Sequence, residues 1–194
     1  MNTTETTEQI QRIQSGDKDA FKQVIEDHKR LVAHIVFRLV NNTTDREDLC
    51  QEVFIKVYQN IAKFRHQCKL STWIGKIAYN TSLNYLQKKR ALLFEDITQE
   101  QSIDSVKGYQ STPHELMESS DISHKLQMEI NQLSDTFRTI ITLYHLQEMS
   151  YKEIGQIMDL PEGTVKSYLF RARRQLRKNW ELKYQEDKSC VANM

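Results

Sequence analysis

A capping pattern, a tight turn and a basic helix follow one another over residues 150–178. Ser150 precedes Glu153 by three residues, the spacing at which each side chain can bond the other's backbone N–H at the start of a helix. A short helix over 151–158 is expected to end in the turn 159–161, and a second helix opens directly after it. Two short helices joined by a tight turn, the second basic, are typical of a helix-turn-helix.

The second of these helices has two different faces. Residues 161–180 hold six bases and one acid. Helical periodicity buries one face, made of Val165, Leu169, Ala172 and Leu176. The other face carries Lys166, Ser167, Phe170, Arg171 and Arg174. An apolar Phe170 on an outward face is costly unless something covers it, as thymine methyls or sugar edges would. A plain three-helix bundle is the alternative.

Residues 62–90 form a second basic segment, with no Asp or Glu. Its seven cations are Lys63, Arg65, Lys69, Lys76, Lys88, Lys89 and Arg90, and its aromatics are Phe64, Trp73, Tyr79 and Tyr85. Cations that follow phosphates and rings that stack bases are what single-stranded nucleic acid requires. The alternative is a solvated helix face over a buried aromatic core. Both hold together if Trp73, Ile77 and Ala78 face that core.

Apolar periodicity predicts further helices on either side of this segment. One runs over 6–28 with a break near 15–17, where Asp17 is a plausible N-cap, and helix continues to Leu39. A helix over 45–62 has an apolar side of Leu49, Val53, Ile55, Val57 and Ile61. Its first turns hold Asp45, Glu47, Asp48 and Glu52, which serve either the helix dipole or a docked protein. A helix capped by Ser134 turns Phe137, Ile140, Ile141, Tyr144 and Leu146 inward.

The scarcity of chain-breaking residues excludes a many-stranded fold, because the sequence has only five Gly and two Pro in 194 residues. We expect an all-α protein of two small helical domains joined by an acidic flexible linker. Residues 91–129 hold eight acids and two bases, with weak apolar periodicity. The predicted divisions are 1–92, the linker 93–125, the helix-turn-helix domain 126–182 and a tail 183–194.

Other features exclude several classes of protein. The polar start has no signal-peptide core, and the most apolar run, 31–40, is too short and too charged to span a bilayer. Cys50, Cys68 and Cys190 are scattered, which indicates reduced cytoplasmic thiols rather than disulfides or a zinc site. No nucleophile–base set, P-loop or metal cluster appears, so we expect no enzyme activity, no cofactor and no metal.

With both basic elements placed, the chain resembles a bacterial RNA polymerase sigma factor of the extracytoplasmic-function (ECF) group of the sigma-70 family. The stretch 45–58 reads DREDLCQEVFIKVY and is similar to the family's core-polymerase-binding helix. Residues 63–86, KFRHQCKLSTWIGKIAYNTSLNYL, are similar to its promoter-melting and −10-reading segment. Residues 133–177, with GTVKS and RAR inside, are similar to its −35-reading domain. The three motifs stand in the family's order.

The resemblance implies roles for individual residues. Contacts to the clamp helices of the polymerase's largest subunit would come from Asp48, Gln51, Glu52 and Phe54. A pocket for one base flipped from the non-template strand would use Phe64, the loop 65–71 with Arg65, Ile77, Ala78 and Asn80, beside Trp73. Flanking phosphates and bases would meet Lys56, Lys63, Lys76, Asn84 and Lys88. The −35 duplex would meet Thr164, Lys166, Ser167, Phe170, Arg171 and Arg174. An anti-sigma factor is implied as a further partner.

Two positions depart from the family's common pattern: Gln87 and Tyr168 each stand where Arg is frequent. Either change would shift the preferred promoter. The alternative function is a helix-turn-helix regulator that binds duplex DNA without melting it, in which case 62–90 is only core and solvated face. A third is a protein-interaction module whose basic segments bind an acidic partner, for which DNA affinity would depend little on salt.

Overall fold

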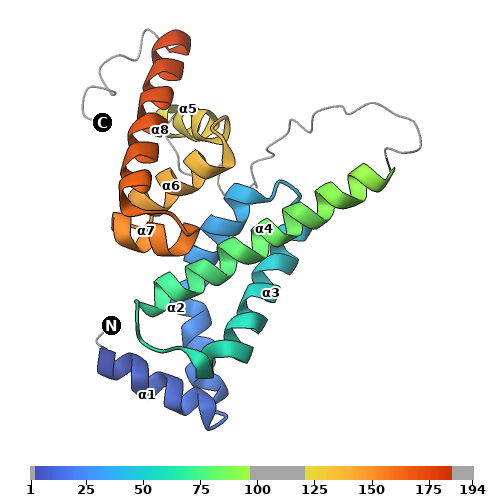
Figure 1. Ribbon diagram of the computed structural model, residues 1–194, viewed down its shortest axis with the longest axis vertical. Helices are drawn as coiled ribbons and strands as arrows, with labels where there is room; N and C mark the ends of the chain where they lie inside the picture. The colour runs from blue at the N-terminus through green and yellow to red at the C-terminus, as the bar shows by residue number, and fades with distance from the viewer. Residues whose placement is uncertain (1–2, 97–120, 185–194) are drawn as a thin grey trace. The chain divides into compact units, whose positions relative to one another are not determined.

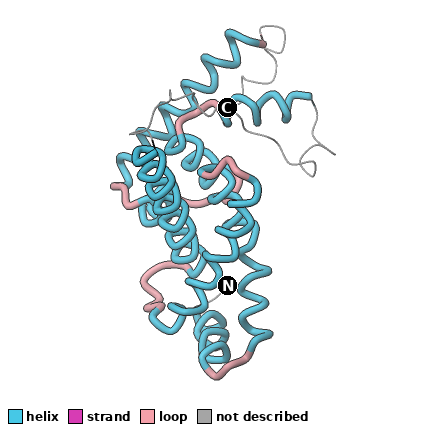
Figure 2. The backbone as a smooth tube through the Cα atoms, turned by 90° about the vertical axis from the view of Figure 1, so that its right-hand side faces the viewer, coloured by secondary structure: helices cyan, strands magenta, loops and turns pink. Residues whose placement is uncertain are grey.

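The structure, a computed structural model, describes residues 3–96 and 121–184. This described part is built from helices and the loops between them and contains no strand (Figure 2). The helices fall into two units (Figure 1): one contains α1 to α4, and the other contains α5, α6, α8 and most of α7. The predicted all-α fold of two helical domains is confirmed.

The first unit consists of four helices and one 3₁₀ turn: α1 (Thr3–Gln14), α2 (Lys18–Leu39), α3 (Thr43–Asn60), η1 (Ile61–Lys63) and α4 (Leu70–Asp96). The break before α2 is confirmed, since Gly16 has a φ of 91° and the Asp17 carboxylate accepts from the N–H groups of Asp19 and Ala20. The bond from Ala20, followed by that from Arg12, lowers the pKa of Asp17. Asp17 is therefore the N-cap that the sequence predicted.

The core of the first unit lies where α2 packs against both α3 and α4. Val32, Ile35 and Val36 of α2 have no exposed surface, and neither have Val53 of α3 and Ile74 of α4. Because these five side chains are apolar and fully buried, removal of their surface from water is a main contribution to holding the three helices together.

Helix α3 differs from its prediction in two respects. It begins at Thr43 rather than Asp45, because the Asn42 side chain accepts from the Asp45 N–H and caps it. Ile55, predicted to lie in the core, is 56% exposed. That prediction was wrong because Ile55 lies about 200° around the helix from both Val53 and Val57, which are fully buried.

The second unit contains α5 (Asp121–Asn131), α6 (Asp135–His145), most of α7 (Tyr151–Met158) and α8 (Glu162–Lys183). Its core includes Leu133, Ile140, Leu143 and Ile154, together with the predicted face of α8. Ser134 caps α6 as expected, but Leu146 is 50% exposed. The prediction that Leu146 points inward was wrong. Helix α6 ends at His145 and Leu146 is its C-cap, so Leu146 does not continue the buried face of the helix.

The ends of α4 and α5 can be compared with the predicted linker between the two domains. Helix α4 extends to Asp96 and α5 begins at Asp121, whereas the acidic linker was predicted over 93–125. Most of that segment, residues 97–120, lies outside the described residues, as does the tail from residue 185. The domain boundaries therefore stay a prediction.

Candidate nucleic-acid interface

The turn between α7 and α8 is fixed by local hydrogen bonds. The Ser150 N–H donates to Glu153 Oε2 over 2.8 Å, and the Glu153 N–H donates to Ser150 Oγ over 3.3 Å, which confirms the capping box. Beyond α7, the Leu160 N–H donates to the Gly155 carbonyl over 3.0 Å. Pro161 is the N-cap of α8, and its carbonyl accepts from the N–H groups of Thr164 and Val165.

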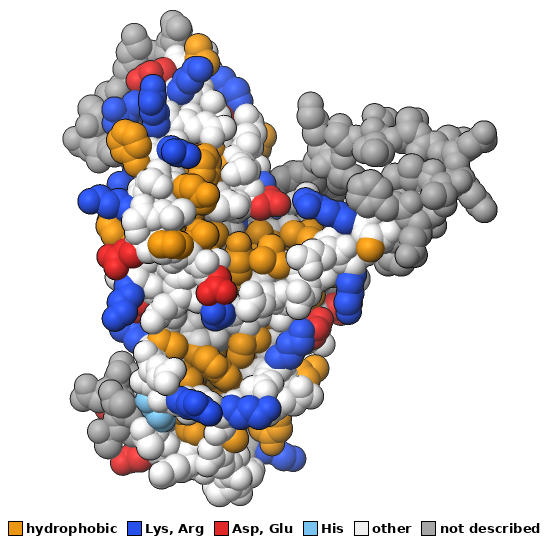
Figure 3. Space-filling view, in the orientation of Figure 1, with side chains coloured by type: hydrophobic (Ala, Val, Ile, Leu, Met, Phe, Trp, Pro, Cys, Tyr) orange, Lys and Arg blue, Asp and Glu red, His pale blue; other side chains and the backbone are white. Residues whose placement is uncertain are grey.

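Helix α8 buries the predicted face and exposes the other. Val165 and Ala172 have no exposed surface, and Phe170 is 66% exposed. The exposed side also holds Lys166, Ser167, Arg171 and Arg174, while Thr164 is half-buried. The space-filling view shows Lys and Arg side chains gathered over α8 (Figure 3). The structure thus presents a basic helix face with one uncovered aromatic ring.

Arg173, on the same helix, is turned the other way. Its guanidinium lies 5.0 Å from the centre of the Tyr144 ring, and its Nε donates to His145 Nε2 over 3.3 Å. Burial, followed by the charge of Arg173, lowers the pKa of His145, which keeps the imidazole a neutral acceptor. Arg173 therefore ties α8 to α6 instead of contributing to the exposed basic face.

Helix α4 carries a second candidate surface. Trp73, Ile77, Asn80, Asn84 and Lys88 recur every three or four residues and so share one side of the helix. Asn80, Asn84 and Lys88 are exposed, and Trp73, Ile77 and Lys76 are half-buried. Ala78 has no exposed surface, so its side chain cannot contact a bound base directly.

The loop before α4 is organised around Phe64. This ring is only 8% exposed, and its centre lies 4.7 Å from that of His66 and 5.4 Å from that of Trp73. His66 has a φ of 56°, a left-handed conformation that is uncommon for residues other than glycine. Arg65 is exposed beside it. Phe64 therefore supports neighbouring rings and offers little surface of its own.

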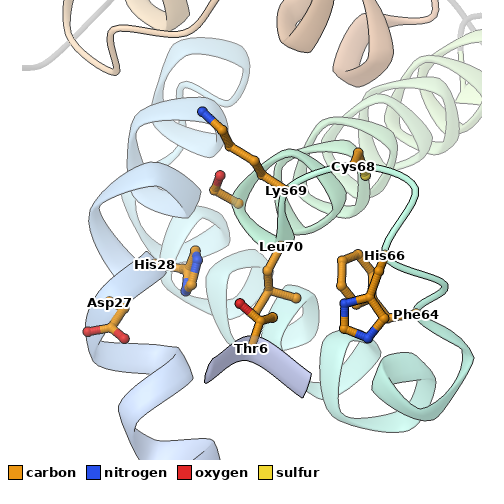
Figure 4. Close-up of a pocket in the computed structure, with 9 residues that line it drawn as sticks. Thr6, Asp27, His28, Phe64, His66, Cys68, Lys69 and Leu70 are labelled. Atoms are coloured by element: carbon orange, nitrogen blue, oxygen red, sulfur yellow. The ribbon is translucent and has the colours of Figure 1, made fainter. Parts of the chain in front are cut away.

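A pocket of about 540 Å³ opens beside this loop (Figure 4). The sequence predicted Phe64 and the 65–71 loop as walls of a base site, and Phe64 with most of that loop does line the pocket. Ile77, Ala78 and Asn80 do not line it. Thr6 from α1 and Asp27 and His28 from α2 do, and no sequence signal linked these residues to the loop.

A third surface lies along α3. The predicted polymerase-binding residues Asp48, Gln51 and Glu52 are exposed, and Phe54 is half-buried. Ile55 and Tyr58, which are 56% and 51% exposed, continue the same side of the helix. The ring of Tyr58 meets that of Phe21 of α2 edge-on, 4.9 Å between centres. This α3 face is therefore acidic at its start and apolar at its end.

Comparisons with known proteins match both units. A model of sigma-70 region 2 matches residues 24–92, and one of sigma-70 region 4 matches residues 123–176. The ECF RNA polymerase sigma factor SigW of Bacillus subtilis is 33% identical over 87% of this chain and 93% of its own length. The chain belongs to the ECF group of sigma-70 factors. The ECF sigma-E factor of Escherichia coli K12 is 37% identical over 84% of this chain and 88% of its own length.

Solved structures agree with this ECF sigma fold. RpoE from Bartonella quintana, in complex with the anti-sigma factor NepR, has a TM-score of 0.68, 23% identity, and coverage of 84% of this chain and 98% of its own. This ECF factor is thus a promoter-directing initiation factor, and the helix-turn-helix regulator that binds duplex DNA without melting it is not favoured.

Several cations and rings of the sigma-70 region 2 unit have partners inside the protein. Lys56 lies 2.7 Å from Glu52 Oε1 and donates to Thr81 Oγ1 over 3.2 Å, and Lys63 donates to Asn60 Oδ1 over 3.2 Å. Tyr85 donates to Asp45, and Lys89 lies 3.5 Å from the same carboxylate. Lys56 is thus already paired with Glu52, and Tyr85 and Lys89 join α4 to α3.

The remaining candidate chemistry of this ECF factor is limited. Burial raises the pKa of the Cys50 thiol to about 11 and also raises that of Cys68, which keeps both as thiols at neutral pH.

Within residues 3–96 and 121–184, no group of three or more His, Cys, Asp or Glu side chains is placed to hold a metal ion. None of the described helices is both long and apolar enough to cross a membrane.

Proposed function

We propose that this sigma factor uses three separate surfaces. The exposed face of α8 reads the −35 duplex, the α4 side with its preceding loop holds the unpaired −10 strand, and the α3 face binds core RNA polymerase. The observation that carries this proposal is the segregation of side chains on α8, where Lys166, Phe170 and Arg171 are exposed while Val165 and Leu169 are buried.

The α8 face has the chemistry that a major groove requires. Arginines can donate two hydrogen bonds to guanine or one to a phosphate, and Phe170 can cover a thymine methyl. Ser167 donates to the Thr164 carbonyl over 2.9 Å, so it is held on the helix and can still accept from DNA. We therefore place the N-terminal half of α8 in the groove.

Replacing both Arg171 and Arg174 by alanine is expected to weaken binding of holoenzyme to a −35 duplex by about 30- to 100-fold. Each lost phosphate contact would also lower the slope of log affinity against log salt by about 0.9. Fluorescence anisotropy over a range of salt concentrations measures both quantities. Lys178→Ala, an exposed cation farther along the same helix, is the matched control and should change affinity less than threefold. Equal effects of the two substitutions would contradict the placement of α8.

The α4 side fits an unpaired strand because it combines a ring, amides and a cation in one row. Trp73 can stack a base, Asn80 and Asn84 can bond base edges, and Lys88 can meet a phosphate. Arg65 is exposed on the loop before α4, and Lys63 is exposed at the end of η1. Phe64 is a poor probe of this site, since its burial makes any truncation costly to stability.

Replacing the exposed Asn80 by alanine is expected to slow promoter opening about tenfold while affinity for the closed duplex changes less than twofold. The amide would bond only the unpaired base, so its loss acts after duplex binding. Stopped-flow fluorescence of 2-aminopurine in the −10 element measures opening. Gln11→Ala, exposed on α1 and outside the three proposed surfaces, is the control. An opening rate unchanged in Asn80→Ala would remove Asn80 from the site.

The α3 face has both components of a protein-docking surface. Asp48, Gln51 and Glu52 supply polar contacts and steering charge, and the exposed Ile55 and Tyr58 supply apolar area. We propose that these five residues, with Phe54, meet the clamp helices of the polymerase's largest subunit.

We further propose that the chain acts in the cytoplasm, has no catalytic activity of its own and is held by an anti-sigma factor. The matched RpoE was solved with NepR, and CnrH, which has a TM-score of 0.64, was solved with the cytosolic domain of CnrY. Co-purification of a small protein that blocks polymerase binding would support an anti-sigma partner.

A further inference from the structure

One ion pair on α3 joins two of the proposed surfaces. Glu52 and Lys56 lie one turn apart on this helix, and the Lys56 ammonium lies 2.7 Å from Glu52 Oε1. Glu52 belongs to the α3 face for which we propose contact with polymerase. Lys56 is one of the cations that the family resemblance places against the −10 strand. The two residues are thus paired with each other in this structure, although their proposed partners are different molecules.

The Lys56 ammonium also reaches α4, which packs beside α3 (Figure 1). It donates to Thr81 Oγ1 over 3.2 Å. Thr81 is 3% exposed and lies four residues after Ile77 and three before Asn84, so it is next to both on the surface of the helix. Lys56 therefore places a positive charge at the edge of the α4 side that is proposed to hold the unpaired strand.

Both groups of the pair are open to other partners. The Glu52 side chain is 49% exposed and the Lys56 side chain is 37% exposed. An ion pair this exposed is weak, because water screens the attraction and two long side chains must be held in one geometry. A cation of a docked protein can therefore take the Glu52 carboxylate, and a phosphate can take the Lys56 ammonium.

The pair opposes phosphate binding while Glu52 has no other partner. A phosphate oxygen that approaches the Lys56 ammonium also approaches the carboxylate 2.7 Å from that ammonium, and the two negative groups repel each other. A positive group of the polymerase on Glu52 would cancel this repulsion. It would also leave the ammonium bonded to the Thr81 hydroxyl, on the α4 side.

We propose that Glu52 and Lys56 exchange partners when core RNA polymerase binds, so that polymerase binding strengthens binding of the −10 strand. Polymerase takes the Glu52 carboxylate, and Lys56 becomes available to a strand phosphate. The inference rests on the proposed roles of the α3 face and of the −10 surface. Because exposed pairs are weak, the coupling is about two- to fivefold, and linkage requires that the strand strengthen polymerase binding by the same factor.

Acetylation of Lys56 by an amine-reactive ester, measured by mass spectrometry, follows the exchange in the full chain. Three samples are compared: the chain alone, the chain with core polymerase, and this holoenzyme with a single-stranded −10 oligonucleotide. Labelling should be slow, then about two- to fivefold faster, then slow again. Lys18, exposed at the start of α2 and outside the three proposed surfaces, is the internal reference. A pair that only stabilises α3 through its i,i+4 spacing would give one rate in all three samples.

Neutralising substitutions separate the pair from the general charge of α3. In Glu52→Gln, Lys56 should be labelled at the fast rate without polymerase. Asp48→Asn removes a charge from the same face two helical turns, about 12 Å, from Lys56, and should leave labelling slow until polymerase is added. Lys56→Gln should weaken strand binding by holoenzyme about two- to fivefold and lower the salt slope by about 0.7, the loss of one phosphate contact.

The outcomes that overturn the exchange differ from those that overturn the surfaces. Lys56 labelling that stays constant or falls when polymerase is added would overturn the exchange, as would labelling of free Asp48→Asn as fast as that of free Glu52→Gln. Strand affinity unchanged in Lys56→Gln would also overturn it. Core affinity unchanged in both α3 variants would overturn the proposed polymerase face. Failure of wild-type holoenzyme to bind the single strand would overturn the proposed −10 site.

Discussion

Replacing Gly155 by alanine is expected to lower the free energy of unfolding of the second unit by about 2–3 kcal/mol. A Cβ at this position would lie 2.6 Å from the Leu160 carbonyl oxygen, a separation that real Cβ atoms essentially never show. The neighbour is backbone, held in place by the Leu160 N–H bond to the Gly155 carbonyl, so it cannot rotate away. The turn that sets α8 against α7 must therefore open.

Gly163, in the same unit, provides the matched control. Gly163 lies in the first turn of α8, and a Cβ there would meet nothing within 4 Å. Gly163→Ala should therefore raise stability, by up to about 1 kcal/mol, because alanine loses less backbone freedom in a helix. Urea unfolding followed by circular dichroism compares the two. A Gly155→Ala protein as stable as Gly163→Ala would contradict the geometry of this turn.

Replacing Arg46 by methionine is expected to destabilise the first unit by about 2–4 kcal/mol. Arg46 is 2% exposed, although it stands among acids in the sequence. Its Nε donates to the Val40 carbonyl over 2.7 Å, and its Nη2 lies 3.4 Å from the Phe37 carbonyl. The guanidinium thus supplies donors to carbonyl oxygens at the C-terminal end of α2 that would otherwise lack a partner. The helix dipole also favours a cation there.

Lysine should not rescue this site, because one ammonium cannot reproduce two separated guanidinium donors or lie flat over the Phe37 ring, which is 5.0 Å from the Arg46 guanidinium carbon. Arg90→Met, an exposed substitution of the same kind on α4, should change stability by less than about 0.5 kcal/mol. Thermal unfolding of the three variants tests this. Equal midpoints for Arg46→Met and Arg90→Met would show that the buried guanidinium contributes nothing.

Local signals predicted the parts of the interface that lie within one helix. The capping box, the turn before α8 and the two faces of α8 follow from spacing alone, since residues three or four apart must share a side of a helix. The same rule failed for α3, where Val53, Phe54, Ile55 and Val57 are all apolar. Periodicity cannot decide which side of such a run is buried, and only the packing of α2 and α4 does so.

The features that the sequence did not predict depend on residues far apart in the chain. Tyr85 and Lys89 were interpreted as part of a nucleic-acid surface, but both contact Asp45, about 40 residues earlier. His28 and Thr6 line a pocket with a loop that begins after Phe64. Nothing local in the sequence marks these contacts, because they form only once α3 has packed on α4 and once α1 and α2 have packed beside the loop.

This sigma factor is expected to open promoters only together with core RNA polymerase. Permanganate reactivity of promoter thymines measures opening directly, in reactions with the protein, with core polymerase and with both. The account predicts reactive thymines in the −10 element only when both are present, and their loss when Asn80 and Asn84 are both replaced by alanine. Binding to the duplex by the protein with no polymerase-dependent reactivity would contradict it.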